Sequence, residues 1–254
     1  MPSTVQILGI RFLDGDVDTA IKSISQGGGV LIAPSGTCFA RLTKDPVYRE
    51  AVVRADLAIP DSGAMVILWR IFRGKRVTRM SGLTYVRRLV EKFAHDPSNR
   101  TMWILPNERA HEKAAVWLNQ SGVGFNAQDF YVAPFYGPNV EDKELARQIE
   151  QHRPDHVVIA IGSGPQEKLG IYLRDNLSYR PAIHCNGAAL GFLTGDQVAI
   201  PQWADRFFLG WLFRLFAQPK IFIPRLTRAA ILPWLILRYG RELPPLRAKR
   251  AGGK

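Results

Sequence analysis

Strand-like and helix-like segments alternate along the first three quarters of the chain, and this alternation limits the fold more than any other feature. The strand-like segments are residues 5–12, 30–34, 56–60, 101–106, 129–137, 155–162 and 181–187. Helical patterns fill most of the intervals between them, and several of these helices stop at glycine. Such alternation is typical of α/β proteins whose strands run parallel. We therefore predict a Rossmann-like, mainly parallel sheet flanked by helices, in a core of residues 1–195.

The composition changes after about residue 195, where aromatic residues and arginines become frequent. From Phe207 to the C-terminus the chain has ten Lys or Arg residues and a single acidic one, Glu242. The longest uncharged apolar run here, residues 229–237, is far shorter than the ~20 residues that a membrane-spanning helix needs. Basic helices with aromatic faces are typical of segments that lie on an anionic membrane surface. Residues 196–254 are therefore predicted to form a membrane-associating helical appendage. The alternative is a helical layer that packs on the core and exposes a basic face to solvent.

The net charge of +12 also favours a polyanionic partner. Phosphorylated substrates and an anionic membrane surface fit this charge. No recognisable nucleic-acid-binding module is present, so no nucleic acid partner is expected. The two cysteines lie far apart in the sequence, which favours a reducing compartment over a disulfide framework. The N-terminal residues lack the basic start and the apolar stretch of a signal peptide. We expect a cytoplasmic protein, peripheral on the inner face of the cell membrane.

The segment "IAIGSGPQEKLG", residues 159–170, suggests a phosphate-binding turn. A buried strand ends at Gly162, Gly164 suits a helix cap, and a proline follows at the first helical position. Backbone N–H groups at such a helix start attract phosphate oxygens. Gln166 and Glu167 would lie in the first turn. Because Glu167 would repel a phosphate, it is expected to contact a sugar hydroxyl or to close the cap. A plain turn without a ligand is the alternative.

A single carboxylate, Asp61, follows the strand-like segment 56–60 and precedes a helical pattern. Aspartate before a helix usually caps it by accepting a backbone N–H. The carboxyl end of a strand is also where ligands bind in open α/β sheets, so Asp61 is equally a candidate for removing a proton. Further on, Arg79 and Gly82 precede the next helix, and an arginine there could bind a diphosphate or simply face solvent. The sequence pattern alone does not decide between capping and proton removal for Asp61, or between diphosphate binding and solvent exposure for Arg79.

Four motifs together resemble one family. They are "ADLAIPDSG" (residues 55–63), "RMSGLTY" (residues 79–85), "GSGPQE" (residues 162–167) and "FLGWLFRLFAQPK" (residues 208–220). Their types and order are similar to those of the WecG/TagA/CpsF glycosyltransferases, and the likeness runs from about Val5 to about Arg225. These enzymes build bacterial cell-surface polymers on a polyprenyl lipid carrier.

The resemblance implies an inverting transfer of a sugar from a UDP-sugar to a polyprenyl-diphosphate-linked sugar, at the cytoplasmic membrane face. The sugar is expected to be an N-acetylhexosamine such as N-acetylmannosamine, or a related hexose. By the same resemblance, Asp61 is the catalytic base and Gln166 lies at the active site. Arg214 and Arg225 occupy the part of the family pattern that reaches the lipid diphosphate. No cofactor and no metal are expected besides the donor, and members of the family can associate, so a homo-oligomer is possible.

The chain also departs from the family pattern. The usual "T-x-N" after the second strand-like segment is "APS" here, so Ser35 or Thr37 is expected to replace a substrate contact. Thr84 stands where the family has aspartate, and Gly210 where it has glutamate. These changes bear on sugar identity, and they keep one alternative open, an inactive membrane-bound protein that binds a nucleotide or a lipid diphosphate. A dinucleotide-dependent enzyme is disfavoured, because no G-x-G-x-x-G follows a strand with an acidic residue about 20 positions on.

Overall fold

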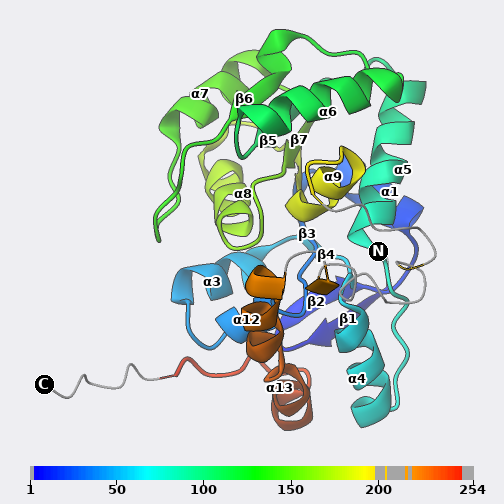
Figure 1. Cartoon of the computed structure of the whole chain (residues 1–254), viewed down its shortest axis with the longest axis vertical. Helices are drawn as coiled ribbons and strands as arrows, with labels where there is room; N and C mark the ends of the chain where they lie inside the picture. Colours follow the sequence, from blue (N-terminus) through cyan, green and yellow to red (C-terminus); the bar gives the residue numbers. More distant parts are fainter. Residues whose placement is uncertain (1–2, 198–203, 205–214, 217–218, 248–254) are drawn as a thin grey trace, which may run out of the picture.

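The computed structural model describes residues 3–197, 204, 215–216 and 219–247. Its centre is an eight-stranded sheet with the order β1-β2-β4-β3-β8-β7-β5-β6, and all neighbouring strands except β1 and β2 run parallel (Figure 1). The strands are β1 (Thr4–Ile7), β2 (Ile10–Leu13), β3 (Gly29–Ile32), β4 (Leu57–Ala58), β5 (Thr101–Leu105), β6 (Phe130–Val132), β7 (His156–Ile159) and β8 (Ala182–Cys185). The predicted α/β class with a mainly parallel sheet is confirmed.

Helices cover both faces of this sheet. One face carries α2 (Cys38–Arg41), α3 (Pro46–Arg54), α4 (Gly63–Arg73), α7 (Lys143–His152) and α8 (Pro165–Asn176); the other carries α1 (Val17–Gly27), α5 (Gly82–His95), α6 (Glu108–Gln120) and α9 (Gly187–Leu193). Alternate residues of the central strands feed the two cores: Val30 and Ile32 pack on the first face, Leu31 and Ala33 on the second. This two-sided burial explains why the central strands read as continuous apolar runs.

The first strand-like segment, residues 5–12, was predicted as one strand, and this was wrong. The chain turns back at Leu8 and Gly9, so that β1 and β2 form an antiparallel hairpin in which Ile7 pairs with Ile10. Both turn residues have positive φ, 51° and 81°, which is the geometry of a two-residue type I′ turn. Leucine is unusual at such a position, so the turn was hidden inside an apolar run.

The C-terminal region includes the helices α12 (Pro219–Ala229) and α13 (Leu232–Tyr239), which lie beyond the sheet. Leu232, Leu235 and Ile236 of α13 are fully buried in the same core cluster as the strands. The segment after α13 is also bound to the sheet, since the N–H groups of Leu8 and Gly9 donate to the carbonyls of Gly240 and Arg241, at 2.8 and 2.9 Å. The helix α13 therefore packs on the core, while the division of the chain at residue 195 stays a prediction.

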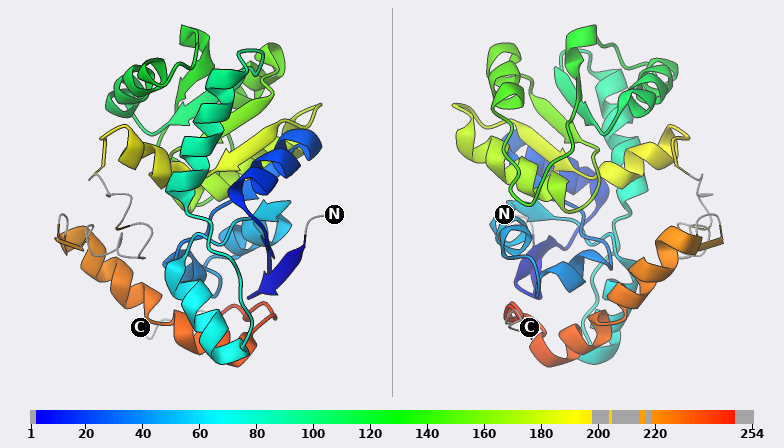
Figure 2. Two further views of the ribbon diagram at one scale, coloured as in Figure 1. Left: turned by 90° about the vertical axis from the view of Figure 1, so that its right-hand side faces the viewer. Right: turned by 60° about the vertical axis from the view of Figure 1, so that its left-hand side comes forward.

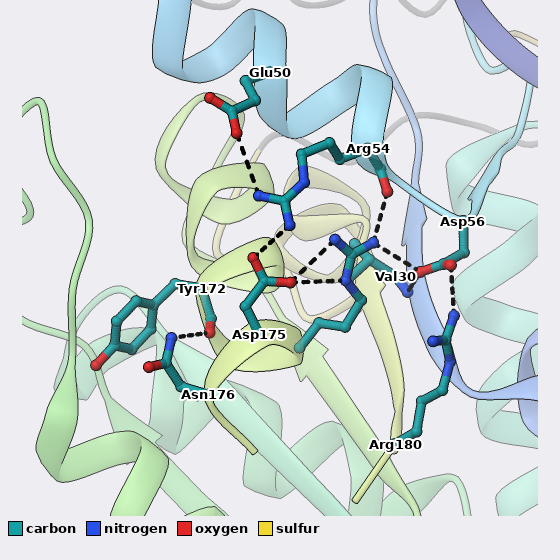
Figure 3. A network of polar contacts seen from close by, with 9 residues as sticks. Val30, Glu50, Arg54, Asp56, Tyr172, Asp175, Asn176 and Arg180 are labelled. Atoms are coloured by element: carbon teal, nitrogen blue, oxygen red, sulfur yellow. Dashed lines mark hydrogen bonds and ion pairs between the residues drawn. The ribbon is translucent and has the colours of Figure 1, made fainter. Parts of the chain in front are cut away.

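A polar network ties the amino ends of the strands together (Figure 3). Asp56, just before β4, accepts from the N–H of Val30 at 2.8 Å and from the guanidinium groups of Arg174 and Arg180, at 3.3 and 2.5 Å. Arg174 also donates to the carbonyl of Arg54 at 2.6 Å. These contacts hold β3, β4, α3 and α8 in place at the edge of the sheet opposite to the predicted site.

Candidate active site

The predicted site residues of the α/β core lie where the parallel strands end. The chain leaves β3 toward helices on one face of the sheet, and it leaves the neighbouring strand β8 toward α9 on the other face. Adjacent strands whose connections diverge in this way leave a crevice above their carboxyl ends, which is the usual ligand site of open α/β sheets. The loops after β4 and β7 border the same crevice.

Asp61 lies in the loop after β4 and is half-buried. It does not cap the helix that follows it. Ser62 is the N-cap of α4 and accepts from the N–H of Met65 at 3.3 Å. The Asp61 carboxylate instead accepts from the N–H of Gly82, the first residue of α5, at 2.9 Å. The carboxylate is thus held at the N-terminus of another helix, whose N–H groups carry partial positive charge.

Arg79 and Asn186 support this arrangement from two sides. The Nε atom of Arg79 donates to the backbone carbonyl of Asp61 at 3.0 Å. Asn186, buried at the end of β8, donates from its amide nitrogen to the carbonyl of Gly82 at 3.0 Å. A Cβ atom added to Gly82 would lie 2.5 Å from Asn186 Oδ1, so this close approach requires glycine. The sequence analysis missed Asn186, although an amide side chain directly after a buried strand was an available signal.

The turn between β7 and α8 has the predicted form. Gly162 and Gly164 both have positive φ, 93° and 107°, which glycine adopts without strain. The Glu167 carboxylate accepts from the N–H of Gly164 at 2.6 Å and is fully buried, so it closes the cap. Burial raises the pKa of this carboxyl. The structure thus shows the capping role of Glu167, and its predicted contact with a sugar stays a prediction.

Gln166 is also buried, and its amide nitrogen points into the protein. It donates to Glu167 Oε1 at 3.1 Å and to the carbonyl of Cys185 at 3.3 Å. The Sγ–H of Cys185 donates back to the carbonyl of Gln166 at 3.2 Å. These bonds fix the first turn of α8 against the end of β8.

Ser35 and Thr37, the predicted replacements for the family's "T-x-N" contacts, lie in the loop after β3. Their hydroxyl oxygens are 3.3 Å apart, and Ser35 Oγ is also 3.3 Å from Cys38 Sγ. Cys38 Sγ in turn lies 2.9 Å from the hydroxyl of Ser163, in the glycine turn before α8. The loop after β3 is therefore joined directly to the loop after β7.

These contacts form a chain that links the loops at the carboxyl ends of the strands. Asp61 contacts Gly82, Gly82 contacts Asn186, and the end of β8 contacts Gln166. The turn before α8 then contacts the loop after β3 through Cys38 and Ser163. Gly36, in the loop after β3, lies close to the loop after β4, since a Cβ atom added to it would be 3.6 Å from the hydroxyl of Ser62. The loops after four neighbouring strands thus lie close together at the carboxyl edge of the sheet.

Arg41, in α2, is a second site residue that the sequence analysis missed. Its Nη1 atom donates to the carbonyl of Ser163 at 3.0 Å, and a Cβ atom on Gly164 would collide with its guanidinium. The cation therefore lies against the turn that was predicted to bind phosphate. The sequence analysis assigned this segment only to a helix. The residues next to Arg41 in the sequence do not indicate that its side chain lies at the turn before α8.

Arg214 lies outside the described residues, and of Arg225 the structure describes only its position in α12. The end of that helix lies beside the site, since a Cβ atom on Gly36 would be 3.9 Å from Cβ of Ala229. Within the described part of the chain there is no group of three His, Cys, Asp or Glu side chains that could hold a metal ion. None of the described helices is long and apolar enough to cross a membrane.

Comparison with known proteins identifies a family and a relative of this chain. A model of the glycosyl transferase WecG/TagA/CpsF family matches residues 5–245. An N-acetylglucosaminyldiphosphoundecaprenol N-acetyl-beta-D-mannosaminyltransferase of Bacillus subtilis (strain 168) is 23% identical over 177 residues, which cover 69% of this chain and 66% of that protein. The family match extends over nearly the whole chain and confirms the resemblance predicted from the four motifs: the chain belongs to the WecG/TagA/CpsF family of glycosyl transferases.

Proposed function

We propose that this chain transfers a sugar from a UDP-sugar to a polyprenyl-diphosphate-linked sugar, with inversion at the anomeric carbon. The donor that we favour carries an N-acetylhexosamine such as N-acetylmannosamine. The name of the Bacillus subtilis relative supports this choice, because it describes transfer of N-acetylmannosamine to a diphosphoundecaprenol-linked N-acetylglucosamine. The proposal extends that chemistry to the present chain through their shared family.

The position of Asp61 carries the proposal. Its carboxylate is half-buried in the loop after β4, held by the N–H of Gly82, and part of the same chain of contacts as the glycine turn before α8. A base and a phosphate-binding turn on one crevice are what a sugar nucleotide and an incoming hydroxyl require.

In the proposed reaction the acceptor hydroxyl oxygen attacks C1 of the donor sugar, on the face opposite to UDP. The proton of that hydroxyl passes to the Asp61 carboxylate. The bond between C1 and the diphosphate oxygen breaks, and its electron pair leaves with UDP. General base catalysis of this kind contributes typically about 10²–10⁴-fold to the rate.

The leaving diphosphate gains negative charge, and we assign its stabilisation to the start of α8 and to nearby cations. Arg41 lies against Gly164 at that helix start, and Arg79 lies beside Asp61. Preorganised donors at the position where charge develops are usually the largest single contribution to catalysis. Arg214 and Arg225 are proposed to meet the lipid diphosphate of the acceptor.

The direct test is UDP release by the purified protein across a panel of UDP-sugars, with and without a short-chain polyprenyl-diphosphate-sugar. We expect release that depends on the acceptor and on one or a few donors. The alternative function is an inactive nucleotide or lipid-diphosphate binder, which the altered "APS" segment keeps open. It predicts UDP binding without release from any donor.

A further inference from the structure

We infer that the outer face of α4 and α13 is a docking surface for an anionic lipid membrane. This α4–α13 face is defined by Ile67, Arg70 and Ile71 on α4 and by Trp234 and Leu237 on α13. The inference rests on the proposed function, because a polyprenyl-linked acceptor is confined to a membrane. It goes beyond that function in placing part of the membrane contact on a helix of the α/β core, outside the C-terminal appendage.

Both helices are apolar on two opposite sides. Toward the core, α4 buries Met65 and Trp69, and α13 buries Leu235 and Ile236. Away from the core, the exposed fractions are 45% for Ile67 and 67% for Ile71, and 50% for Trp234 and 59% for Leu237. The inner residues account for packing, so the outer aliphatic and aromatic side chains need another partner.

The two helices lie side by side. Arg73, at the end of α4, donates from Nη2 to the carbonyls of Ile236 and Leu237, at 2.8 and 2.9 Å. Figure 2 shows α4 and α13 side by side at one end of the molecule in both views, far from α6 and α7. The four exposed apolar side chains therefore belong to a single end of the protein.

The charges along α4 and the segment that follows it are all positive. Arg70, Arg73, Lys75 and Arg76 are all exposed, and the sequence contains no Asp or Glu between Asp61 and Glu91. Within the described residues, no carboxylate forms a salt bridge with Arg70, Lys75 or Arg76. Alternating cations and apolar side chains suit the boundary between anionic headgroups and acyl chains. A symmetric dimer through this face would instead bring the same cations against one another.

The position of the face relative to Asp61 also fits a lipid-linked acceptor. Helix α4 begins at Gly63, two residues after Asp61, and its eleven residues span about 16 Å. The chain then returns through the basic segment 74–78 to Arg79, which binds the carbonyl of Asp61. One helix thus connects the proposed base to the proposed membrane contact.

The test is co-sedimentation of the full chain with vesicles of phosphatidylcholine, with and without phosphatidylglycerol. We expect binding to the anionic vesicles, and partitioning at least about tenfold weaker for the double variant Ile67→Asp/Ile71→Asp. The matched control is Val116→Asp on α6, where an exposed valine (59%) at the other end of the molecule is replaced in the same way. The control should bind like the wild type.

A second pair of variants tests the charge. Arg70→Gln/Lys75→Gln should weaken binding to anionic vesicles by about fivefold or more for each cation removed, and the loss should shrink at high salt. Lys22→Gln/Lys143→Gln removes two exposed cations from α1 and α7 and should leave binding unchanged.

Equal vesicle binding by the wild type and the Ile67→Asp/Ile71→Asp variant would overturn the inference. So would an aspartate variant that changes only the oligomeric state in size-exclusion chromatography with light scattering, because the face would then join two copies of the chain. Vesicle binding needs no substrate, so this test is separate from UDP release. UDP release with no effect of the face variants on vesicle binding would refute the docking surface but not the proposed function. Vesicle binding that depends on the face, with no UDP release from any donor, would refute the proposed function but not the docking surface.

Discussion

At the scale of single residues, the site depends on close contacts that only certain side chains allow. The Asp61 carboxylate is oriented by the N–H of Gly82, and Gly82 is oriented by the buried amide of Asn186. Asp61 therefore depends on two residues that need not touch a substrate. This connects the glycine of one of the four motifs, residues 79–85, to the aspartate of another, residues 55–63.

The variant Gly82→Ala should damage activity through Asp61. A Cβ atom at this position would lie 2.5 Å from Asn186 Oδ1, so the start of α5 has to shift and the carboxylate moves with it. We expect kcat/KM for sugar transfer to fall by about 10- to 100-fold, since small misplacements of catalytic groups have effects of this size. The free energy of unfolding should fall by about 1–3 kcal/mol, as for other overpacked sites.

The matched control is Gly124→Ala, because a Cβ atom there meets no other atom within 4 Å. Steady-state kinetics and urea unfolding should give wild-type values for this control. Wild-type kcat/KM in Gly82→Ala would show that Asp61 is not positioned through α5.

At the scale of elements, α5 is joined to the two central strands β7 and β8 by a buried polar chain. The hydroxyl of Tyr85 lies 2.7 Å from His184 Nδ1, and His184 Nε2 lies 3.0 Å from His156 Nδ1. A neutral imidazole has one nitrogen that donates and one that accepts, so both contacts can form when both rings are neutral. Burial lowers the pKa of His156 to about 4 and that of His184 well below its ordinary value.

These histidines should make the fold sensitive to acid. Lys92 on α5 also lowers the pKa of His156, and Asp155 opposes this effect more weakly. Below about pH 6.5 His156 is protonated in the unfolded chain, whereas in the folded chain it stays neutral down to about pH 4. Its contribution to stability is therefore present above this window and is lost as the pH falls through it. For His156 alone, the loss between pH 7 and pH 5 is on the order of 2 kcal/mol.

Urea unfolding at pH 7 and pH 5 measures this effect. In His156→Gln the drop in unfolding free energy between the two pH values should be smaller than in the wild type, by roughly that amount. In His152→Gln, where an exposed histidine is replaced, the drop should match the wild type. The same pH dependence in all three proteins would rule out His156 as its source.

At the scale of the whole molecule, the C-terminal region is partly built into the core. Three side chains of α13 are fully buried in the core, and the carbonyls of Gly240 and Arg241 accept hydrogen bonds from the turn of the β1–β2 hairpin. A chain that ends at residue 195 should therefore lose about 5 kcal/mol or more of stability, at about 1.5–3 kcal/mol for each lost buried apolar side chain. Thermal unfolding monitored by circular dichroism would show this as a large fall in Tm.

A truncated chain with an unchanged Tm would contradict the packing of α13 on the core. The expected loss also decides how the appendage has to be studied. Surface substitutions, which leave α13 in place, separate membrane binding from folding, whereas deletion of the region does not.

The sequence predicted the sheet, most of the helices and the strand ends at which the site lies, because hydrophobic periodicity and glycine stops are local signals. It did not predict the β1–β2 hairpin, because Leu8 in a left-handed turn looks like one more residue of an apolar run. It also did not place Arg41 or Asn186 at the site. Their roles depend on the order of strands in the sheet, which brings together loops that are more than 100 residues apart in the chain.

The central claim is that Asp61 takes the proton of the acceptor in a sugar transfer. The most direct measurement is a single-turnover transfer assay with Asp61→Asn beside the wild type, together with calorimetric titration of UDP into both proteins. We expect Asp61→Asn to fold, to bind UDP as the wild type does, and to transfer sugar about 10²–10⁴-fold more slowly. Full transfer by a folded, UDP-binding Asp61→Asn protein would contradict the account.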